Sequence, residues 1–292
     1  MHDKILICTD LDRTLLPNGK QAESPHARTL FRRFCEQAHV TLVYVSGRDR
    51  RLLLEAIEAF DIPIPDYAIG DVGTSIYHVE DSDWHLDPAW SRLQESDWGG
   101  RHRQELEAML GPVTELSAQE AEKQNTFKLS YYLPLDCDEK DILHRMYSIL
   151  EAQNIRANII WSIDEEKHIG LVDVLPRAAN KLEAIRFLNR SLAIPLERTL
   201  FSGDSGNDLS VLTSEIPAVL VANASDEVRE EALRLAKQHQ AKDRLYLAHG
   251  DFYGLNGNYS AGILEGIHHY LDDCRAWFEN NLDPAAHSSS SS

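Results

Sequence analysis

Short, continuous runs of hydrophobic residues recur along the chain, and each is followed directly by a polar cluster. Continuous rather than alternating runs are typical of strands that are covered on both faces of a sheet. Helical patterns lie between the runs, and this order predicts a parallel sheet in an α/β layer. The expected strands are residues 4–9, 40–45, 67–69, 198–201 and 218–221, and the expected helices are residues 24–37, 50–59, 181–190 and 207–212.

The middle of the chain has a different pattern. A polar helical segment is followed by an alternating strand, a second helix and a further apolar run, at residues 101–110, 127–133, 138–153 and 156–161. This mixture predicts a second, α+β domain inserted into the first.

The predicted fold class is therefore α/β, with a Rossmann-like parallel sheet core and an inserted α+β cap domain. We expect residues 171–176 to return the chain to the large sheet. The expected domains are a core at residues 1–83 and 169–275, the cap at residues 84–168, and a tail at residues 276–292.

Composition excludes two classes of partner. The chain carries 29 Lys and Arg against 47 Asp and Glu, a formal charge of −18, whereas proteins that bind nucleic acid or anionic membranes normally have a basic excess. Four irregularly spaced cysteines indicate neither a zinc ribbon nor a disulfide scaffold. The chain has no stretch typical of a signal peptide or a membrane span, so we expect a cytoplasmic protein. The terminal run Ser288 to Ser292 is left out of the fold prediction as a flexible tail.

The candidate chemistry lies at the ends of the expected strands, which carry Asp10, Ser46, Asp71 and Asp204. Ligands of open parallel sheets bind at the carboxyl ends of the strands, so these side chains are expected to converge.

Asp10 and Asp12 follow the first strand within Asp10-Leu11-Asp12-Arg13-Thr14. Two neighbouring carboxylates raise the pKa of one group and leave the other ionised, which suits one nucleophile and one acid/base. A carboxylate that attacks phosphorus forms an acyl phosphate, and the second residue can protonate the leaving alcohol. The alternative is that Asp12 or Thr14 only caps a turn or helix.

Residues 203–208, Gly-Asp-Ser-Gly-Asn-Asp, lie between a strand and a helix. Glycines allow a ligand to approach the backbone, and two aspartates four residues apart beside Asp10 form an oxygen-rich site that suits Mg²⁺. The alternative is a helix-capping turn in which Ser205 and Asn207 are the caps.

Ser46, Gly47, Arg48 and Lys181 are candidates for contacts with a phosphate substrate. A capping Ser and turn Gly would explain the first two residues equally well. A cation at the start of a helix is unfavourable for the helix dipole, which favours Lys181 as a phosphate ligand. The alternative is a solvated surface lysine, the default for an isolated residue. In the predicted reaction Mg²⁺, Lys181 and Ser46 hold the phosphoryl oxygens while Asp10 attacks, and Asp12 then activates the hydrolytic water.

These segments resemble the haloacid dehalogenase superfamily of phosphohydrolases. The motifs D-x-D-x-T, Ser/Thr-Gly-Arg, Asn-Lys and GDSGND occur in that superfamily's order, and a cap between the second and third motifs resembles its type IIB subgroup. More specifically, the chain resembles the sucrose-phosphate phosphatases at residues 65–67, 72–78, 128–131, 172–176, 180–181 and 261–267.

The resemblance implies Asp10 as nucleophile and Asp12 as acid/base. It implies Mg²⁺ on Asp10, the Asp12 carbonyl and Asp204, with Asp208 in support. Thr14, Ser46, Gly47, Lys181 and Asn207 are then expected at the phosphate. We assign Arg48 to the substrate, together with Lys128 of the cap, although a strand lysine on a solvent face explains Lys128 as well.

The resulting hypothesis is a Mg²⁺-dependent phosphatase of sucrose 6-phosphate. We expect it to bind the sugar phosphate and to associate with a sucrose-phosphate synthase. Alternatives are a phosphatase of another glycoside phosphate (mannosylfructose phosphate or glucosylglycerol phosphate), a phosphomutase, and a non-catalytic subunit of a glycosyltransferase. The presence of Asp10, Asp12, Lys181, Asp204 and Asp208 argues against the last. An acidic chain can bind a small phosphate ester if one cleft gathers Mg²⁺ and a few cations.

Overall fold

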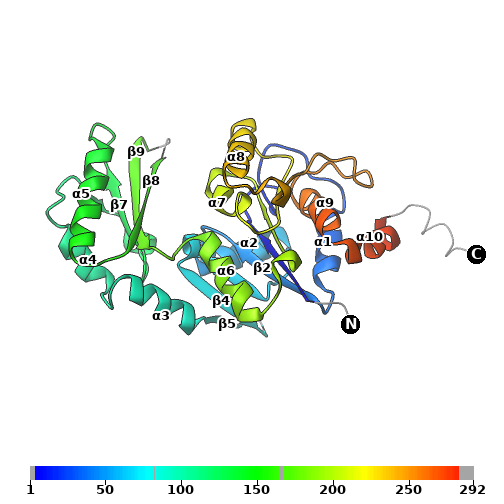
Figure 1. Cartoon of the computed structure of the whole chain (residues 1–292), viewed down its shortest axis with the longest axis horizontal. Coiled ribbons are helices and arrows are strands. Elements are labelled where there is room, and N and C mark those ends of the chain that lie inside the picture. The colour runs from blue at the N-terminus through cyan, green and yellow to red at the C-terminus, as the bar shows by residue number, and fades with distance from the viewer. Residues whose placement is uncertain (1–3, 82, 165–166, 283–292) are drawn as a thin grey trace, which may run out of the picture. The chain divides into compact units, whose positions relative to one another are not determined.

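The computed structural model describes residues 4–81, 83–164 and 167–282, and Figure 1 shows the course of the chain. The chain divides into two compact units. The first unit takes its residues from 1–72, 77–85 and 185–292, and the second unit from 73–76 and 86–184. The predicted Ser-rich end, Ser288 to Ser292, lies outside the described residues.

An eight-stranded sheet organises the first unit. The strand order is β12-β11-β10-β1-β2-β3-β4-β5, and the neighbours from β12 to β3 pair in parallel. Every residue of β1 is buried, as a strand covered on both faces requires. The predicted α/β fold with a parallel sheet is confirmed. The strands are β1 (Ile5–Thr9), β2 (Val40–Val45), β3 (Tyr67–Gly70), β4 (Ser75–Glu80), β5 (Asp83–Leu86), β10 (Thr199–Gly203), β11 (Ala218–Leu220) and β12 (Leu245–Leu247).

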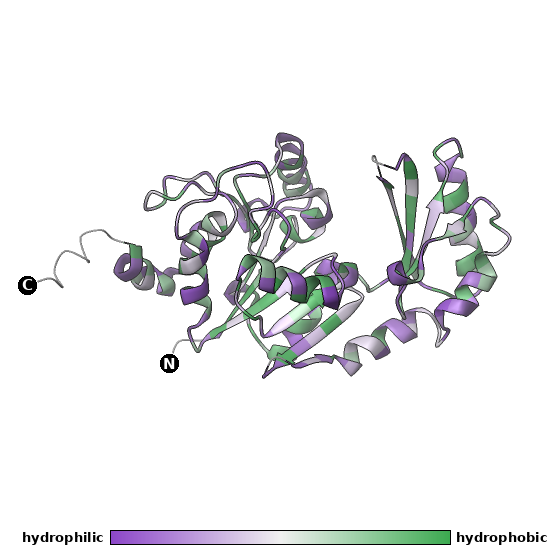
Figure 2. Cartoon of the chain, turned by 180° about the vertical axis from the view of Figure 1, so that it is seen from behind, coloured by the Kyte–Doolittle hydropathy of each residue, from purple (hydrophilic) through white to green (hydrophobic). Residues whose placement is uncertain are grey.

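Helices connect these strands or follow the last of them, and Figure 2 shows hydrophilic and hydrophobic residues along them. The first turns of two of them are closed by side chains that accept backbone N–H groups, Asp49 before α2 and Ser225 before α8. The first helix begins later than predicted, because His26 has a left-handed backbone (φ 65°) that helical residues do not adopt. The helices are α1 (Ala27–Cys35), α2 (Arg50–Phe60), α6 (Lys181–Leu192), α7 (Leu209–Leu212), α8 (Asp226–Gln238), α9 (Ser260–Tyr270) and α10 (Arg275–Leu282).

The helix α10 corrects the prediction of a tail from residue 276. Phe278 is fully buried, and its ring stacks on Phe34 of α1 with centroids 5.8 Å apart. Trp277 meets the same Phe34 ring edge-on at 5.2 Å. The two aromatic side chains therefore join α10 to the core of the first unit.

The second unit has its own antiparallel sheet, with strand order β6-β7-β9-β8. Its hydrophobic core includes Leu106, Leu150 and Val172. The strands are β6 (Ser117–Ala118), β7 (Leu129–Leu133), β8 (Ala157–Asp164) and β9 (Ile169–Pro176), and the helices are α3 (Pro88–Asp97), α4 (Arg103–Leu110) and α5 (Glu139–Ala152).

Strand β9 overturns the expectation that residues 171–176 return to the large sheet. It pairs with β7 on one side and β8 on the other, within the second unit. Burial alternates along most of β9, as in a strand with one covered face. The second unit consequently extends to Ala184, beyond the predicted end of the cap at residue 168.

Over the part of the chain that the structure describes, no helix combines the length and the hydrophobicity that crossing a membrane requires.

Candidate active site

The order of strands in the large sheet reverses between β1 and β10. The chain continues from β1 to β2 and β3 on one side, and from β10 to β11 and β12 on the other. At such a point the connections leave in opposite directions, which opens a crevice at the carboxyl ends of the two strands. Asp10 follows β1 and Asp204 follows β10, so both carboxylates lie at this crevice.

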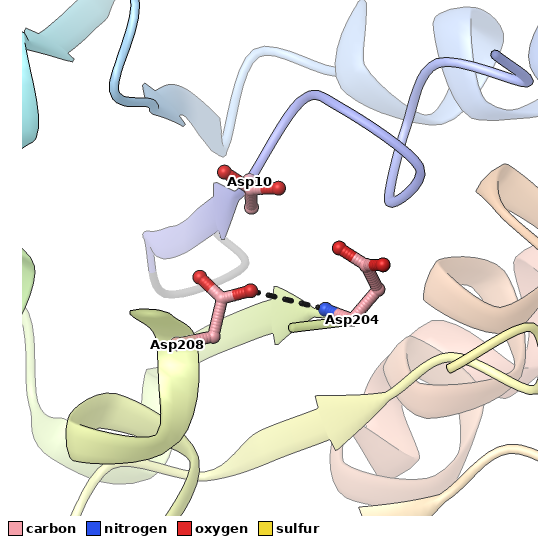
Figure 3. A group of neighbouring side chains, drawn as sticks. All are labelled: Asp10, Asp204 and Asp208. Atoms are coloured by element: carbon pink, nitrogen blue, oxygen red, sulfur yellow. Dashed lines mark hydrogen bonds between the residues drawn. The ribbon is translucent and has the colours of Figure 1, made fainter. Parts of the chain in front are cut away.

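Three buried carboxylates meet there, as Figure 3 shows. Asp10, Asp204 and Asp208 each offer an oxygen within 4.8 Å of the oxygens of the other two. The Thr14 hydroxyl lies 3.3 Å from Oδ2 of Asp10 and 3.3 Å from Oδ1 of Asp204, a contact between residues 190 positions apart. The structure thus brings together four of the residues that the sequence predicts at the metal and the phosphate.

The turn after β10 is shaped by Asp208. Its Oδ2 accepts the backbone N–H groups of Asp204 and Ser205, each at 3.1 Å. Residue 203 has to be glycine, because a Cβ there would lie 2.6 Å from the Asp208 carboxyl carbon. Ser205 and Asp208 form a capping box, and the exposed Asn207 accepts a hydrogen bond from Ser205 Oγ at 3.1 Å. The turn is therefore both a helix start and a source of two carboxylates.

The electrostatics of this cluster favour a cation. Burial raises the pKa of Asp204 above its ordinary value, the Arg13 guanidinium opposes the shift, and the Asp208 charge adds to it. Oδ2 of Asp204 is buried and lies 2.7 Å from Nη2 of Arg13. A cluster of buried carboxylate oxygens matches the ligands that Mg²⁺ prefers, so these residues fit that ion.

The Asp12 side chain lies outside the three-carboxylate cluster and is 44% exposed. Arg48 donates to both of its oxygens, from Nε to Oδ2 at 2.8 Å and from Nη2 to Oδ1 at 2.6 Å. Asn18 Nδ2 donates to Oδ1 at 2.7 Å. The hydrogen bond to Asp12 raises the pKa of Arg48, so the guanidinium stays charged. Arg48, which the sequence analysis assigns to the substrate, is thus a partner of Asp12.

Ser46 and Gly47 form the turn after β2. Ser46 is buried, its N–H donates to Ile69 at 2.8 Å, and its Oγ accepts the N–H of Arg48 at 3.2 Å. The helix α2 is capped by Asp49, so the alternative reading of Ser46 as the helix cap is wrong. Gly47 is exposed.

Lys181 belongs to the second unit and is the first residue of α6, with 2% of its surface exposed. The Asn180 side chain caps the N-terminus of this helix, since its Oδ1 accepts the N–H of Glu183 at 2.9 Å. Gly73 (φ 98°) packs directly against Asn180, since a Cβ at residue 73 would lie 2.6 Å from the Asn180 carbonyl carbon. Gly73 and Asn180 therefore fix the backbone that carries Lys181.

Lys128 lies in the second unit, just before β7. Its Nζ is 3.7 Å from Oδ2 of Asp173, and the Ser130 hydroxyl donates to Oδ1 of the same carboxylate. The Lys128 side chain is 15% exposed, so it is not a lysine on an open solvent face.

Sequence reasoning missed Arg13 and Asn18. Arg13 Nη2 lies 2.7 Å from Oδ2 of Asp204, and Asn18 contacts both the Asp12 carboxylate and the Arg13 N–H. Arg13 occupies the variable position of D-x-D-x-T, where the pattern gives no chemical signal.

Comparison with known proteins identifies the family of the chain. A family model described as sucrose-6F-phosphate phosphohydrolase matches residues 3–271. The chain is 50% identical to a HAD-like hydrolase of Nitrosococcus oceani whose name gives no substrate, over 98% of this chain and 77% of the relative. It is 29% identical to mannosylfructose-phosphate phosphatase of Agrobacterium fabrum, over 91% of this chain and 96% of the relative.

Among solved structures, the sucrose-phosphatase of Synechocystis in complex with sucrose and phosphate is similar, with a TM-score of 0.68 and 26% identity. The match covers 92% of this chain and 98% of that one. With the family model extending over most of the sequence, the chain belongs to the sucrose-6F-phosphate phosphohydrolase family of the haloacid dehalogenase superfamily.

Proposed function

We propose that the protein is a Mg²⁺-dependent phosphatase that hydrolyses sucrose 6-phosphate to sucrose and phosphate. The observation that carries this proposal is the cluster of Asp10, Asp204 and Asp208 at the reversal of strand order, joined by the Thr14 hydroxyl. The membership of the family supports the substrate class.

In the proposed reaction an Asp10 carboxylate oxygen attacks phosphorus, an O–P bond forms, and the bond from phosphorus to the sugar oxygen breaks. Asp12 gives a proton to that departing oxygen. Asp12 then takes a proton from the water that attacks the aspartyl phosphate, which regenerates Asp10 and releases phosphate. Arg48 contacts both Asp12 oxygens and Asn18 contacts Oδ1. These contacts support the role, because they restrict the carboxylate to one orientation.

Mg²⁺ held by Asp10, the Asp12 carbonyl and Asp204, with Asp208 in support, would neutralise charge on the phosphoryl oxygens. We assign Thr14, Ser46, Gly47, Lys181 and Asn207 to those same oxygens. The burial of Lys181, with 2% of its surface exposed, supports this assignment, since a positive charge attracts an anion more strongly away from water. We assign Lys128 to the sugar.

A panel of phosphate esters tests the substrate. Phosphate release is measured with sucrose 6-phosphate, mannosylfructose phosphate, glucosylglycerol phosphate and glucose 6-phosphate, in Mg²⁺ and in EDTA. We expect kcat/KM for sucrose 6-phosphate to exceed kcat/KM for each other ester by about tenfold or more. A difference of this size corresponds to one or two polar contacts that the other esters do not make. Activity should vanish in EDTA and return with Mg²⁺.

Mannosylfructose phosphate is the second candidate substrate. The 29% identity to a mannosylfructose-phosphate phosphatase over nearly its whole length favours it. A higher kcat/KM on mannosylfructose phosphate than on sucrose 6-phosphate would replace the sucrose assignment and leave the reaction class unchanged.

A sucrose-phosphate synthase is the proposed protein partner, because such an enzyme would supply the phosphate ester. Co-purification from cells, with turnover intact in the isolated chain, is the expected result. A chain that releases phosphate from no ester and copurifies with a glycosyltransferase would instead be a non-catalytic subunit.

A further inference from the structure

Arg13 makes a direct ion pair within the carboxylate cluster. Its Nη2 lies 2.7 Å from Oδ2 of Asp204, whose side chain is 1% exposed. The other Asp204 oxygen, Oδ1, is contacted by the Thr14 hydroxyl. Arg13 and Thr14 therefore contact different oxygens of this carboxylate.

The backbone of Arg13 is fixed by contacts on both sides. Its N–H donates to Asn18 Oδ1 at 2.8 Å, and its carbonyl accepts Asn223 Nδ2 at 2.6 Å. Asn223 is in turn held by the N–H of Tyr259 at 2.9 Å. Arg13 has φ 60°, a left-handed conformation that is unfavourable for a residue with a side chain. The surrounding hydrogen bonds hold a strained residue in place, and its side chain meets Asp204 as a result.

The Arg13 side chain has room to leave this position. It is 49% exposed and lines a cavity of about 450 Å³ together with Lys20, Asn223 and neighbouring polar residues. The guanidinium can therefore rotate away from Asp204 while the backbone contacts persist.

We propose that Arg13 is a built-in competitor of the divalent cation for Asp204, an inference that rests on the metal site of the proposed function. The guanidinium neutralises the Asp204 carboxylate that the cation would bind. A cation therefore either displaces Arg13 or binds beside a positive charge, and both weaken the measured affinity. In the metal-free protein Arg13 offsets the repulsion among Asp10, Asp204 and Asp208.

The variant Arg13→Asn tests this proposal. Asparagine is neutral, too short to reach Asp204, and tolerates a left-handed backbone. Mn²⁺ binding without substrate is measured from the free Mn²⁺ signal in electron paramagnetic resonance, and Mg²⁺ binding by competition. We expect Arg13→Asn to bind both ions about tenfold more tightly than wild type. This factor lies in the usual range for two ligands that weaken each other's binding, here the guanidinium and the metal ion. We also expect a lower Tm than wild type in EDTA and a larger rise in Tm on adding Mg²⁺.

Two further variants complete the experiment. Lys20→Gln removes a cation of the same loop and should keep the wild-type dissociation constant within about twofold, as a screened surface charge does. Arg13→Lys retains the charge and should bind Mn²⁺ more weakly than Arg13→Asn.

Equal dissociation constants in wild type and Arg13→Asn, or weaker binding in Arg13→Asn, overturn the competition and leave the proposed metal site standing. Tighter binding of the same size in Lys20→Gln also overturns it, since the effect would then be general electrostatics. A wild-type protein that binds neither ion overturns the metal site itself.

Discussion

Each unit of the molecule holds a carboxylate against a cation, but in different surroundings. In the first unit, Asp204 is 1% exposed and contacts Arg13 at 2.7 Å. In the second unit, Asp173 is 24% exposed and lies 3.7 Å from Lys128. The first carboxylate belongs to a cluster of three, whereas the second is contacted by the Ser130 hydroxyl.

The difference follows from the two sheets. Parallel strands bring their carboxyl ends to one edge of the sheet. Residues that follow neighbouring strands, such as Asp10 and Asp204, therefore lie close together although they are distant in sequence. An antiparallel sheet presents alternate side chains on its faces, and a pair such as Ser130 and Asp173 meets across neighbouring strands. We infer that the carboxylates of the first unit perform the phosphoryl chemistry, and that the second unit contributes Lys181 and selects the substrate.

The largest expected effect is that of Asp10→Asn. Loss of the nucleophile should reduce kcat by about 10³-fold or more on both sucrose 6-phosphate and p-nitrophenyl phosphate. Asp226→Asn, which makes the same charge change at an exposed position of α8, is the control and should keep wild-type kcat. Substantial turnover by Asp10→Asn would refute the nucleophile assignment.

Arg48→Gln should have the next largest effect. Loss of the paired contact with Asp12 should lower kcat by about 10²-fold, the usual contribution of a positioned acid/base, with KM within about twofold. Arg48→Lys should restore little, because an ammonium cannot reproduce two parallel hydrogen bonds. A raised KM with unchanged kcat would return Arg48 to the substrate contact that the sequence predicts.

Lys128→Met should separate the two units. We expect KM for the sugar phosphate to rise about tenfold, the loss of one charged contact, with kcat little changed. The kinetics on p-nitrophenyl phosphate, which lacks a sugar, should match wild type. Equal losses on both substrates would contradict the division of labour between the units.

The smallest effect on chemistry is expected from Leu150→Ala in the core of the second unit. Truncating this fully buried side chain should lower the free energy of unfolding by about 2–5 kcal/mol, as measured by urea denaturation. Turnover of p-nitrophenyl phosphate at low temperature should stay at the wild-type value. Lost turnover in a variant with a native circular dichroism spectrum would show that the two cores are coupled.

The strands that carry Asp10 and Asp204 could be predicted because they are continuous hydrophobic runs, each followed by a polar motif. Strand β12 is not predicted, since a strand of three half-buried residues at the edge of a sheet is too short to form a recognisable hydrophobic run. Residues 171–176 pair within the second unit, whereas the sequence predicts that they join the large sheet. Their apolar character resembles a doubly covered strand, while the pairing with β7 and β8 depends on distant residues.

Within the site, the sequence indicates which residues bear chemistry but not which ones contact each other. Arg48 and Asp12 are 36 positions apart, and no local pattern predicts that one guanidinium would meet both carboxylate oxygens. Arg13 is hidden for a similar reason, since its direction depends on a left-handed backbone held by Asn223, 210 positions away.

The Thr14 hydroxyl contacts Asp10, four positions before it, and Asp204, 190 positions after it. This separation affects when the contacts can form during synthesis of the chain. At about 5 to 20 residues per second, a ribosome needs roughly 10 to 40 s to synthesise the chain between these two contacts. During that interval the emerging chain carries Asp10, the proposed nucleophile, without the other two carboxylates. The carboxylate cluster therefore cannot form until most of the chain has been made, and we expect no phosphatase activity before then.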